Sequence, residues 1–148
     1  MKLHLEITTL KHMQDFLKNV RPLDLQEAEL DGTKFIDQPL SEFDNCQSLV
    51  DENGNVYAIG GILADIDGYG TVWMLCTTRV EQHKITFLRY TKWLLKSKFQ
   101  NGFYKILGNK AWLNNQLHIN WLTWMGAHWG DKTPDGQCRY FYFRKEKI

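Results

Sequence analysis

The sequence predicts an α/β protein with a single mixed, mostly antiparallel sheet and helices on both faces. The predicted elements follow one another in the order β-α-α-β-β-β-α-β-α-β. The apolar runs Gln47–Val50 and Val56–Asp65 flank the turn sequence Asp51–Asn55 and predict an antiparallel hairpin. A strand, a helix and a second strand over residues 71–108 then predict one parallel crossover. Antiparallel pairing followed by a single parallel step indicates one mixed sheet covered by helices.

The composition is that of one folded domain covering residues 1–148. Aromatic residues make up 14% of the chain, which argues against extensive disorder. No run reaches the roughly 18 apolar residues of a membrane span, and the first residues lack the pattern of a signal peptide. We therefore expect a soluble, intracellular protein with no membrane partner.

The net charge of +1 hides an asymmetry between the two parts of the chain. Residues 1–67 carry five Lys or Arg and thirteen Asp or Glu, whereas residues 68–148 carry thirteen and four. The basic part is suited to a phosphate-bearing ligand or an acidic partner, or it pairs with the acidic part. A weak basic–aromatic pattern consists of Lys92, Lys96 and Lys98 beside Tyr90 and Trp93. Since the sequence contains no nucleic-acid-binding motif, we do not expect nucleic acid as the partner.

The three cysteines are Cys46, Cys76 and Cys138, widely spaced and without a CxxC pair. A disulfide framework or a structural zinc site is therefore not expected, and no metal site is predicted. Cys76 lies in an apolar run, so we interpret it as a small buried hydrophobe rather than a nucleophile.

A strand and a helix are predicted at the start of the chain. Leu3–Thr8 alternates apolar and polar residues, as a strand does. Thr8 or Thr9 is expected to cap a helix that runs through Val20 with apolar residues at helical spacing. Arg21-Pro22 breaks this helix.

A short acidic helix, Asp24–Leu30, is predicted next, capped by Asp24 and ended by Asp31-Gly32. Lys34–Asp44 is polar and is predicted to be irregular. After the hairpin the predicted elements are a strand Thr71–Thr77, a helix Ile85–Phe99, a strand Tyr104–Gly108, a helix from Asn114 or Asn115 through Met125 that Gly126 ends, and a strand Gln137–Arg144.

The junction Thr77–Thr86 joins a predicted strand to the start of a predicted helix. A helix start presents backbone N–H groups that lack partners within the helix, and such groups bind anions. Lys84, with Arg79 and Arg89 nearby, adds positive charge. If the chain binds a phosphorylated ligand, we expect the phosphate at this junction.

The second half of the sequence resembles the GNAT acyltransferases. The resemblance is carried by Ile106–Asn109, Asn115, His118, Trp121-Leu122 and Met125–Ala127. In that family a strand is likewise followed by Asn, a small residue, an aromatic position and a helix that ends at Gly. The order of the predicted elements is also that of the family, and the resemblance covers roughly residues 46–143. It implies a GNAT-like acyl-CoA N-acyltransferase fold.

A closer likeness is to a family of GNAT-like phage proteins. It is carried by Ala58–Gly61, Gly108-Asn109, Met125–Ala127 and Asp135–Gln137. That family includes a small internal virion protein of short-tailed coliphages. The resemblance implies a phage gene product that acts in the host bacterial cytoplasm or is carried in the virion.

The resemblance to GNAT enzymes implies acetyl-CoA as the cofactor. In these enzymes the sheet splays between its fourth and fifth strands, and the acyl-CoA arm lies in that opening. By resemblance, the backbone of Leu75–Thr77 would bond the thioester arm and the N–H groups of His83–Thr86 would hold the pyrophosphate. The implied cofactor-binding set is Leu75, Cys76, Thr77, Arg79, Gln82, His83, Lys84, Ile85, Thr86, Asn109 and Asn115.

Two positions depart from the family's pattern. The family's phosphate loop carries glycines that let phosphate approach the backbone, whereas Gln82–Phe87 contains none. Ile85 and Phe87 stand in their place. Leu122 stands where many members carry a Tyr that protonates the departing thiolate, so Tyr140 or Tyr142 would have to act instead.

A general base would take a proton from the acceptor amine. The residues considered for this role are Glu52, Asp65, Asp67, Glu81 and His118. His118 lies one helical turn after Asn115. The catalytic candidates retained are His118, Glu81 and, as the acid, Tyr140.

Two functions follow as alternatives. The first is a phage-encoded, acetyl-CoA-dependent N-acyltransferase of a small amine or of a host or phage protein. The second is a catalytically degenerate GNAT-like protein of the virion or of its morphogenesis, acting through contacts with virion components. The missing glycines and Leu122 favour the second, and the fold supports the first by analogy.

Overall fold

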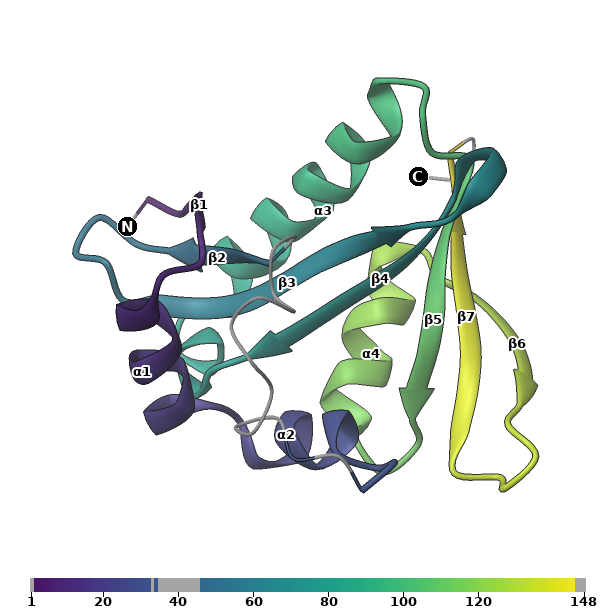
Figure 1. Cartoon of the computed structure of the whole chain (residues 1–148), viewed down its shortest axis with the longest axis horizontal. Helices are drawn as coiled ribbons and strands as arrows, with labels where there is room; N and C mark the ends of the chain where they lie inside the picture. Colours follow the sequence, from purple (N-terminus) through teal and green to yellow (C-terminus); the bar gives the residue numbers. More distant parts are fainter. Residues whose placement is uncertain (1, 33, 35–45, 146–148) are drawn as a thin grey trace. The chain divides into compact units, whose positions relative to one another are not determined.

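The computed structural model describes residues 2–32, 34 and 46–145 (Figure 1). Of the predicted irregular segment Lys34–Asp44, all but Lys34 lies outside the described residues. The strands are β1 (His4–Ile7), β2 (Gln47–Val50), β3 (Val56–Ala64), β4 (Tyr69–Cys76), β5 (Ile106–Trp112), β6 (His128–Lys132) and β7 (Cys138–Arg144). The helices are α1 (Leu10–Asn19), α2 (Pro22–Ala28), α3 (Lys84–Gln100) and α4 (Gln116–Met125), with short 3-10 turns η3 (Ile66–Gly68) and η4 (Thr78–Glu81).

The strands form one seven-stranded sheet in the order β1-β2-β3-β4-β5-β7-β6 (Figure 1). The pairs β1–β2, β2–β3, β5–β7 and β6–β7 are antiparallel. β4 and β5 are parallel, with Tyr69–Thr71 in register with Ile106–Gly108. The predicted fold class is therefore confirmed, and β4-α3-β5 is the predicted crossover.

The chain forms two compact units. The first consists of Met1–Ile62 and Trp73–Phe87, and the second of Leu63–Val72 and Leu88–Ile148. β3, β4 and α3 each contribute residues to both units. The candidate site residues are accordingly divided between the two.

In the first unit, α1 begins with a reciprocal cap. The Oγ1 atom of Thr9 accepts from the His12 N–H at 3.1 Å, and the Nδ1 atom of His12 accepts from the Thr9 N–H at 3.2 Å. This satisfies two N–H groups that the helix itself leaves free. Of the two predicted cap residues, Thr8 and Thr9, the structure shows that Thr9 is the N-cap.

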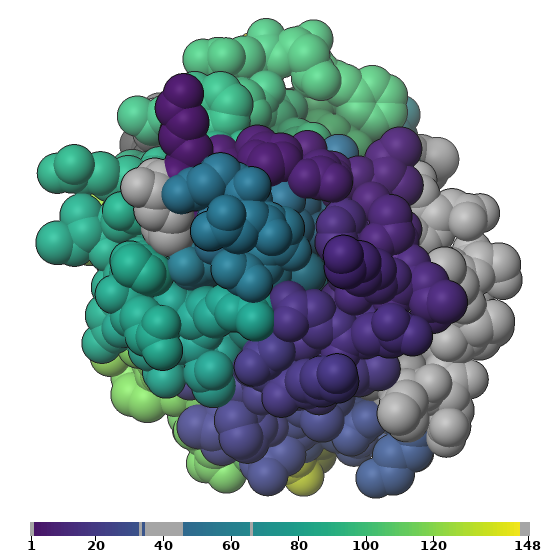
Figure 2. Space-filling model, turned by 90° about the vertical axis from the view of Figure 1, so that its left-hand side faces the viewer, coloured from purple at the N-terminus to yellow at the C-terminus, as the bar shows by residue number. Residues whose placement is uncertain are grey.

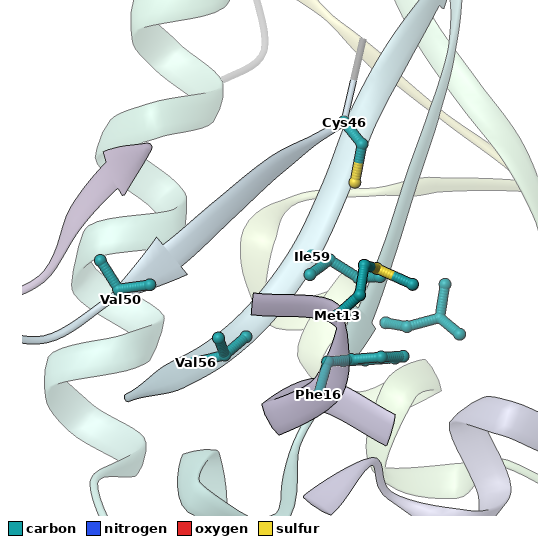
Figure 3. Packing of buried hydrophobic residues seen from close by; sticks show 7 residues of the cluster. Met13, Phe16, Cys46, Val50, Val56 and Ile59 are labelled. Atoms are coloured by element: carbon teal, nitrogen blue, oxygen red, sulfur yellow. The ribbon is translucent and has the colours of Figure 1, made fainter. Parts of the chain in front are cut away.

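The core of the first unit lies between α1 and the strands β2, β3 and β4. Met13 and Phe16, one turn apart on α1, lie in one buried cluster with Val56 and Ile59 of β3 (Figure 3). The same buried cluster also includes Cys46, Val50 and Leu75. Residues 56–60 of β3 are all buried, so both faces of the sheet are covered here. The predicted hairpin of β2 and β3 is confirmed, and residues of both strands belong to this core.

The second helix differs from the prediction at both ends. α2 runs from Pro22 to Ala28, with Pro22 in its first turn, where a missing N–H costs nothing. Asp24 is not the N-cap residue; Arg21 occupies that position, without a side-chain cap. Asp24 lies inside the first turn and is buried, because its carboxylate bonds to other parts of the unit.

In the second unit, β5 and β7 are paired along their whole length, from Ile106 with Arg144 to Trp112 with Cys138. β5 therefore starts two residues later and ends four residues later than predicted. Phe141 and Phe143 of β7 are buried, whereas Tyr140 is exposed. Along residues 140–144, buried phenylalanines thus alternate with exposed or half-buried residues.

The strand β6 was not predicted. It pairs with β7 as a hairpin across the turn at Thr133–Gly136, where Gly136 has a φ of +74°. Thr133 Oγ1 accepts from the Cys138 N–H at 3.1 Å and contacts Asp135 Oδ1 at 2.7 Å. The Pro-Asp-Gly sequence of this turn is a signal that could have revealed the hairpin.

α3 and α4 match their predictions closely. α4 ends at Gly126, whose φ of +100° is the left-handed conformation of a helix C-cap. Asn115 precedes α4 as predicted, but its side chain makes no capping hydrogen bond to the helix. Among the helices that the structure describes, none is long and apolar enough to cross a membrane.

Candidate functional site

The first candidate feature is the start of α3, in the first unit. The first α-helical bond runs from the Phe87 N–H to the His83 carbonyl at 3.0 Å, so the preceding N–H groups, those of Lys84, Ile85 and Thr86, have no partner within the helix. All three residues are exposed. The partial positive charge of a helix start and the ammonium of Lys84 both favour an anion here.

Of the two side chains that stand in place of the family's glycines, one is buried and one is exposed. Phe87 is buried and therefore turned away from solvent. Ile85 is 67% exposed. Glu81 and Gln82 are exposed as well, and the His83 ring contacts that of Tyr57 at 6.0 Å between centroids. The residues of the helix start are compatible with a phosphate group.

Arg79 has a structural partner. Its Nη1 and Nη2 atoms donate to the two carboxylate oxygens of Asp15 at 2.6 and 3.0 Å, and Nη1 also donates to the Val56 carbonyl at 2.9 Å. Asp15 in turn accepts from the Val56 N–H at 2.9 Å. Figure 2 shows this face, where α1, the β2–β3 turn and the segment leading into α3 adjoin one another. Arg79 therefore neutralises Asp15 and joins α1 to β3.

The Asp15–Arg79 pair makes stability depend on pH. The hydrogen bond from Arg79 holds the pKa of the Asp15 carboxyl below its ordinary value, against the opposing effect of burial. A carboxyl with a lower pKa in the folded state stabilises the fold above its unfolded pKa of about 4, and this contribution is lost as the pH falls through the folded pKa.

We expect Asp15→Asn to lower the free energy of unfolding at pH 7 by about 1.5–3 kcal/mol, the contribution of a hydrogen bond to a charged group. The difference from the wild type should shrink toward pH 3, where the wild-type carboxylate is being protonated. Urea unfolding of both proteins at pH 7, 5 and 3 measures it. A difference that stays constant over this range would contradict the ionic role of Asp15.

The second feature is the end of β4, which the resemblance assigns to the thioester arm. The Thr77 N–H donates to the Tyr57 carbonyl of β3 at 2.9 Å. The Cys76 N–H donates to Asp24 Oδ2 at 2.8 Å, and the Cys76 carbonyl accepts from the Arg21 N–H at 2.9 Å. The backbone groups of Cys76 and Thr77, which the resemblance assigns to the arm, are thus bonded within the unit in this structure, and their binding of a ligand stays a prediction.

Arg21 connects this strand end to the candidate base Glu81. The guanidinium of Arg21 donates to Asp24 Oδ1 and, through Nε, to Glu81 Oε1 at 3.3 Å. Arg21 and Asp24 are each only 7% exposed, whereas about half of the Glu81 side chain is exposed. Burial raises the pKa of the Cys76 thiol well above its ordinary value, which agrees with the interpretation of Cys76 as a small buried hydrophobe.

The remaining site candidates lie in the second unit. Asn109 on β5 donates through Nδ2 to the Val72 carbonyl at 3.0 Å and accepts through Oδ1 from the Lys110 N–H at 2.8 Å. Asn115 is fully buried before α4, and its carbonyl accepts the Ile119 N–H at 3.1 Å. Both asparagines therefore have bonds within their own unit, which hold β5 and the start of α4.

The catalytic candidates of this unit lie on different elements. His118 on α4 is half-buried and stacks on Trp121, with ring centroids 5.7 Å apart. Tyr140 on β7 is exposed and lies opposite Lys110 in the β5–β7 register. Leu122 is buried. Because leucine carries no hydroxyl group, this position cannot supply the acid that the family carries there.

The other three base candidates occupy turns. Glu52 in the β2–β3 turn accepts from the Lys2 N–H at 2.8 Å. Asp65 and Asp67 lie in the β3–β4 turn, where Asp67 has a φ of +62°.

Sequence reasoning missed the buried pair of Arg21 and Asp24. The only signal was their spacing of three residues, which also occurs on exposed helix faces.

No family model and no curated protein sequence matches the chain. Solved structures do match it. A GNAT-family acetyltransferase from Bacillus anthracis has a TM-score of 0.72 at 8% identity, with 99% of this chain and 96% of that chain covered. Spermidine N-acetyltransferase from Vibrio cholerae, in complex with CoA and spermine, has a TM-score of 0.72 at 11% identity, with 98% and 96% covered.

A GNAT-family acetyltransferase from Staphylococcus aureus Mu50 has a TM-score of 0.67 at 13% identity, with 97% of this chain and 99% of that chain covered. Likeness over almost the whole of both chains, at identities this low, is a likeness of fold. It agrees with the strand order and with the parallel step between β4 and β5. The chain therefore has the fold of the GNAT acyl-CoA N-acyltransferases.

Proposed function

We propose that this protein is an acetyl-CoA-dependent N-acyltransferase that acts on an amine of a small molecule or of a protein. The observation that carries the proposal is the exposed start of α3, which follows β4 through the short turn η4 and presents the N–H groups of residues 84–86 with the side chain of Lys84. The fold supports it by analogy, since one similar structure is a spermidine N-acetyltransferase in complex with CoA and spermine.

The chain's own residues would act mainly by binding and orientation. Acetyl-CoA would supply an activated acetyl group, and Lys84 with the N–H groups of residues 84–86 would hold its phosphates. Glu81 and His118 are the proposed bases for the amine, and Tyr140 is the proposed acid. Holding an amine against the thioester in a productive geometry supplies much of the rate enhancement in such a reaction.

Titration of the purified protein with acetyl-CoA and CoA, followed by calorimetry and thermal unfolding, tests this function. A ligand at a hundred times its dissociation constant adds about 2.7 kcal/mol of stability. We expect saturable one-to-one binding that Lys84→Ala weakens by about tenfold, the loss of one charge-assisted contact worth about 1.4 kcal/mol. Lys96→Ala, an exposed lysine further along α3, is the matched control and should bind as the wild type does.

A second candidate function is that of a catalytically degenerate GNAT-fold protein acting through protein contacts. The bonded backbone of Cys76 and the buried Leu122 favour it. The surface for such contacts would include Trp93, which is 59% exposed on α3 between Arg89 and Lys96. A phage or host protein, or a virion component, in the host bacterial cytoplasm is the proposed partner.

The titration discriminates between the two functions. No binding and no stabilisation at millimolar acetyl-CoA, in the wild type and in the Asp24 variants described below, would reject the acyltransferase and leave the degenerate protein. Binding that responds to Lys84→Ala and not to Lys96→Ala would reject the degenerate protein. Acetylation of a panel of amines, read by release of free CoA thiol, would then identify the acceptor class.

A further inference from the structure

The end of β4 offers backbone groups along an edge that does not face β3. Successive residues of a strand direct their N–H and C=O groups to alternate edges. Thr77 directs its N–H to the Tyr57 carbonyl of β3, so the N–H and C=O of Cys76 point to the opposite edge. An extended chain with alternating amide groups would pair with that edge as an added strand does.

The chain's own α1–α2 connection occupies this edge. Val20 forms an antiparallel bridge with Thr77, and the Arg21 N–H donates to the Cys76 carbonyl at 2.9 Å. The Asp24 carboxylate accepts from the Cys76 N–H at 2.8 Å. Both polar backbone groups of Cys76 are thus bonded, one to a backbone group and one to a carboxylate.

The bonds at Cys76 are held by a buried ion pair. Arg21 donates to the second oxygen of Asp24, and both side chains are nine-tenths shielded from solvent. Arg21 also reaches Glu81 through Nε at 3.3 Å. Release of the Cys76 N–H by Asp24 therefore requires either that the ion pair between Asp24 and Arg21 breaks or that both side chains move together.

We propose that Arg21 and Asp24 form a self-inhibitory clip that excludes an acyl-CoA arm from the end of β4. The inference rests on the proposed function, since the arm is that of its cofactor. In the closed state the arm's amide groups find the Cys76 N–H and C=O already bonded. Binding then requires a minor open state in which Asp24 has released the Cys76 N–H and the Arg21 N–H has released the Cys76 carbonyl. The apparent affinity falls by the fraction of molecules that are open.

If the clip exists, substitution of Asp24 should raise the affinity for CoA. Asp24→Asn removes the charge that binds Arg21 but keeps the size of the side chain, and Asp24→Ala also removes the acceptor of the Cys76 N–H. If the open state holds about a tenth or less of the wild-type molecules, both variants should bind CoA about tenfold or more tightly than the wild type does. Hydrogen exchange of the Cys76 amide should be slow in the wild type and faster in both variants.

Asp51→Asn is the matched control. Asp51 is also a buried carboxylate of the first unit, and it accepts from the Asn53 and Asn55 N–H groups at 3.0 and 2.9 Å. Its loss should destabilise the fold without raising the affinity for CoA. Circular dichroism of each variant verifies that it is folded at the temperature of the titration, and Asp24→Asn serves if Asp24→Ala does not fold.

The outcomes separate the clip from the function on which it rests. A gain in CoA affinity in the Asp24 variants and not in Asp51→Asn supports the clip. Equal affinity in the wild type and in the Asp24 variants, or rapid exchange of the wild-type Cys76 amide, overturns the clip and leaves the acyltransferase standing. No binding to the wild type or to any variant at millimolar CoA overturns both.

Discussion

Arg21→Ala is expected to lower the free energy of unfolding by about 3–5 kcal/mol, because it leaves a buried carboxylate without its cation. Arg21 and Asp24 are paired in a nearly solvent-free position, and Asp24 also accepts from the Cys76 N–H. In the variant the Asp24 carboxylate lacks the Arg21 guanidinium, so Asp24 either keeps its charge at this buried position or draws in water. Urea unfolding at pH 7, extrapolated to zero denaturant, measures the loss.

Arg89→Ala is the control for this substitution. Arg89 is exposed on α3, and its replacement should change stability by no more than about 0.5 kcal/mol. The double variant Arg21→Ala with Asp24→Ala should be less destabilised than the sum of the two single variants, because the unpaired charge is gone. A loss below about 1 kcal/mol for Arg21→Ala alone would show that water already solvates Asp24 in the folded protein.

Phe16→Ala should destabilise the protein by a similar amount, about 3–5 kcal/mol, through lost burial and the cavity that remains. Phe16 is fully buried among Met13, Val56 and Ile59, where α1 packs on β3 (Figure 3). Because Asp15 lies on α1, loosening this helix should also weaken the ion pair between Asp15 and Arg79. Thermal and urea unfolding should agree on the loss.

Leu10→Ala provides the comparison on the same helix. Leu10 is 62% exposed in the first turn of α1, so its replacement removes little buried surface. The change should stay within about 0.5 kcal/mol. If Phe16→Ala cost no more than Leu10→Ala, the packing of α1 against the sheet would not be the source of stability in the first unit.

Features of the candidate site that depend on residues close together in the sequence could be predicted, whereas those that depend on contacts between distant residues could not. The strand-to-helix junction at residues 77–86 was visible because apolar runs and helix formers are local patterns. The bond from Asp24 to the Cys76 N–H spans 52 residues, and nothing near Asp24 indicates it. The acidic residue at a helix start looked like a cap, since Asp is common at that position.

Arg79 illustrates the same limit. Its position near the helix start suggested a charge for a phosphate, but Asp15, 64 residues earlier, takes up its guanidinium. Coulomb energy depends on the distance in space, which a sequence does not contain. The open helix start was also decided in three dimensions, because the helical phase turns Phe87 into the core and leaves Ile85 outside.

The sequence by itself determined the order of the elements apart from β6, the β2–β3 hairpin, a Thr cap at residue 8 or 9 and the helix end at Gly126, because each depends on residues a few positions apart. From these the mixed sheet and its one parallel step followed. Only the tertiary structure decided that α2 begins at Pro22, that β6 completes the sheet, and that Arg21 and Asp24 occupy the end of β4. Those features depend on which groups come into contact when distant segments pack. Polar groups that become buried there form hydrogen bonds with the groups that lie next to them.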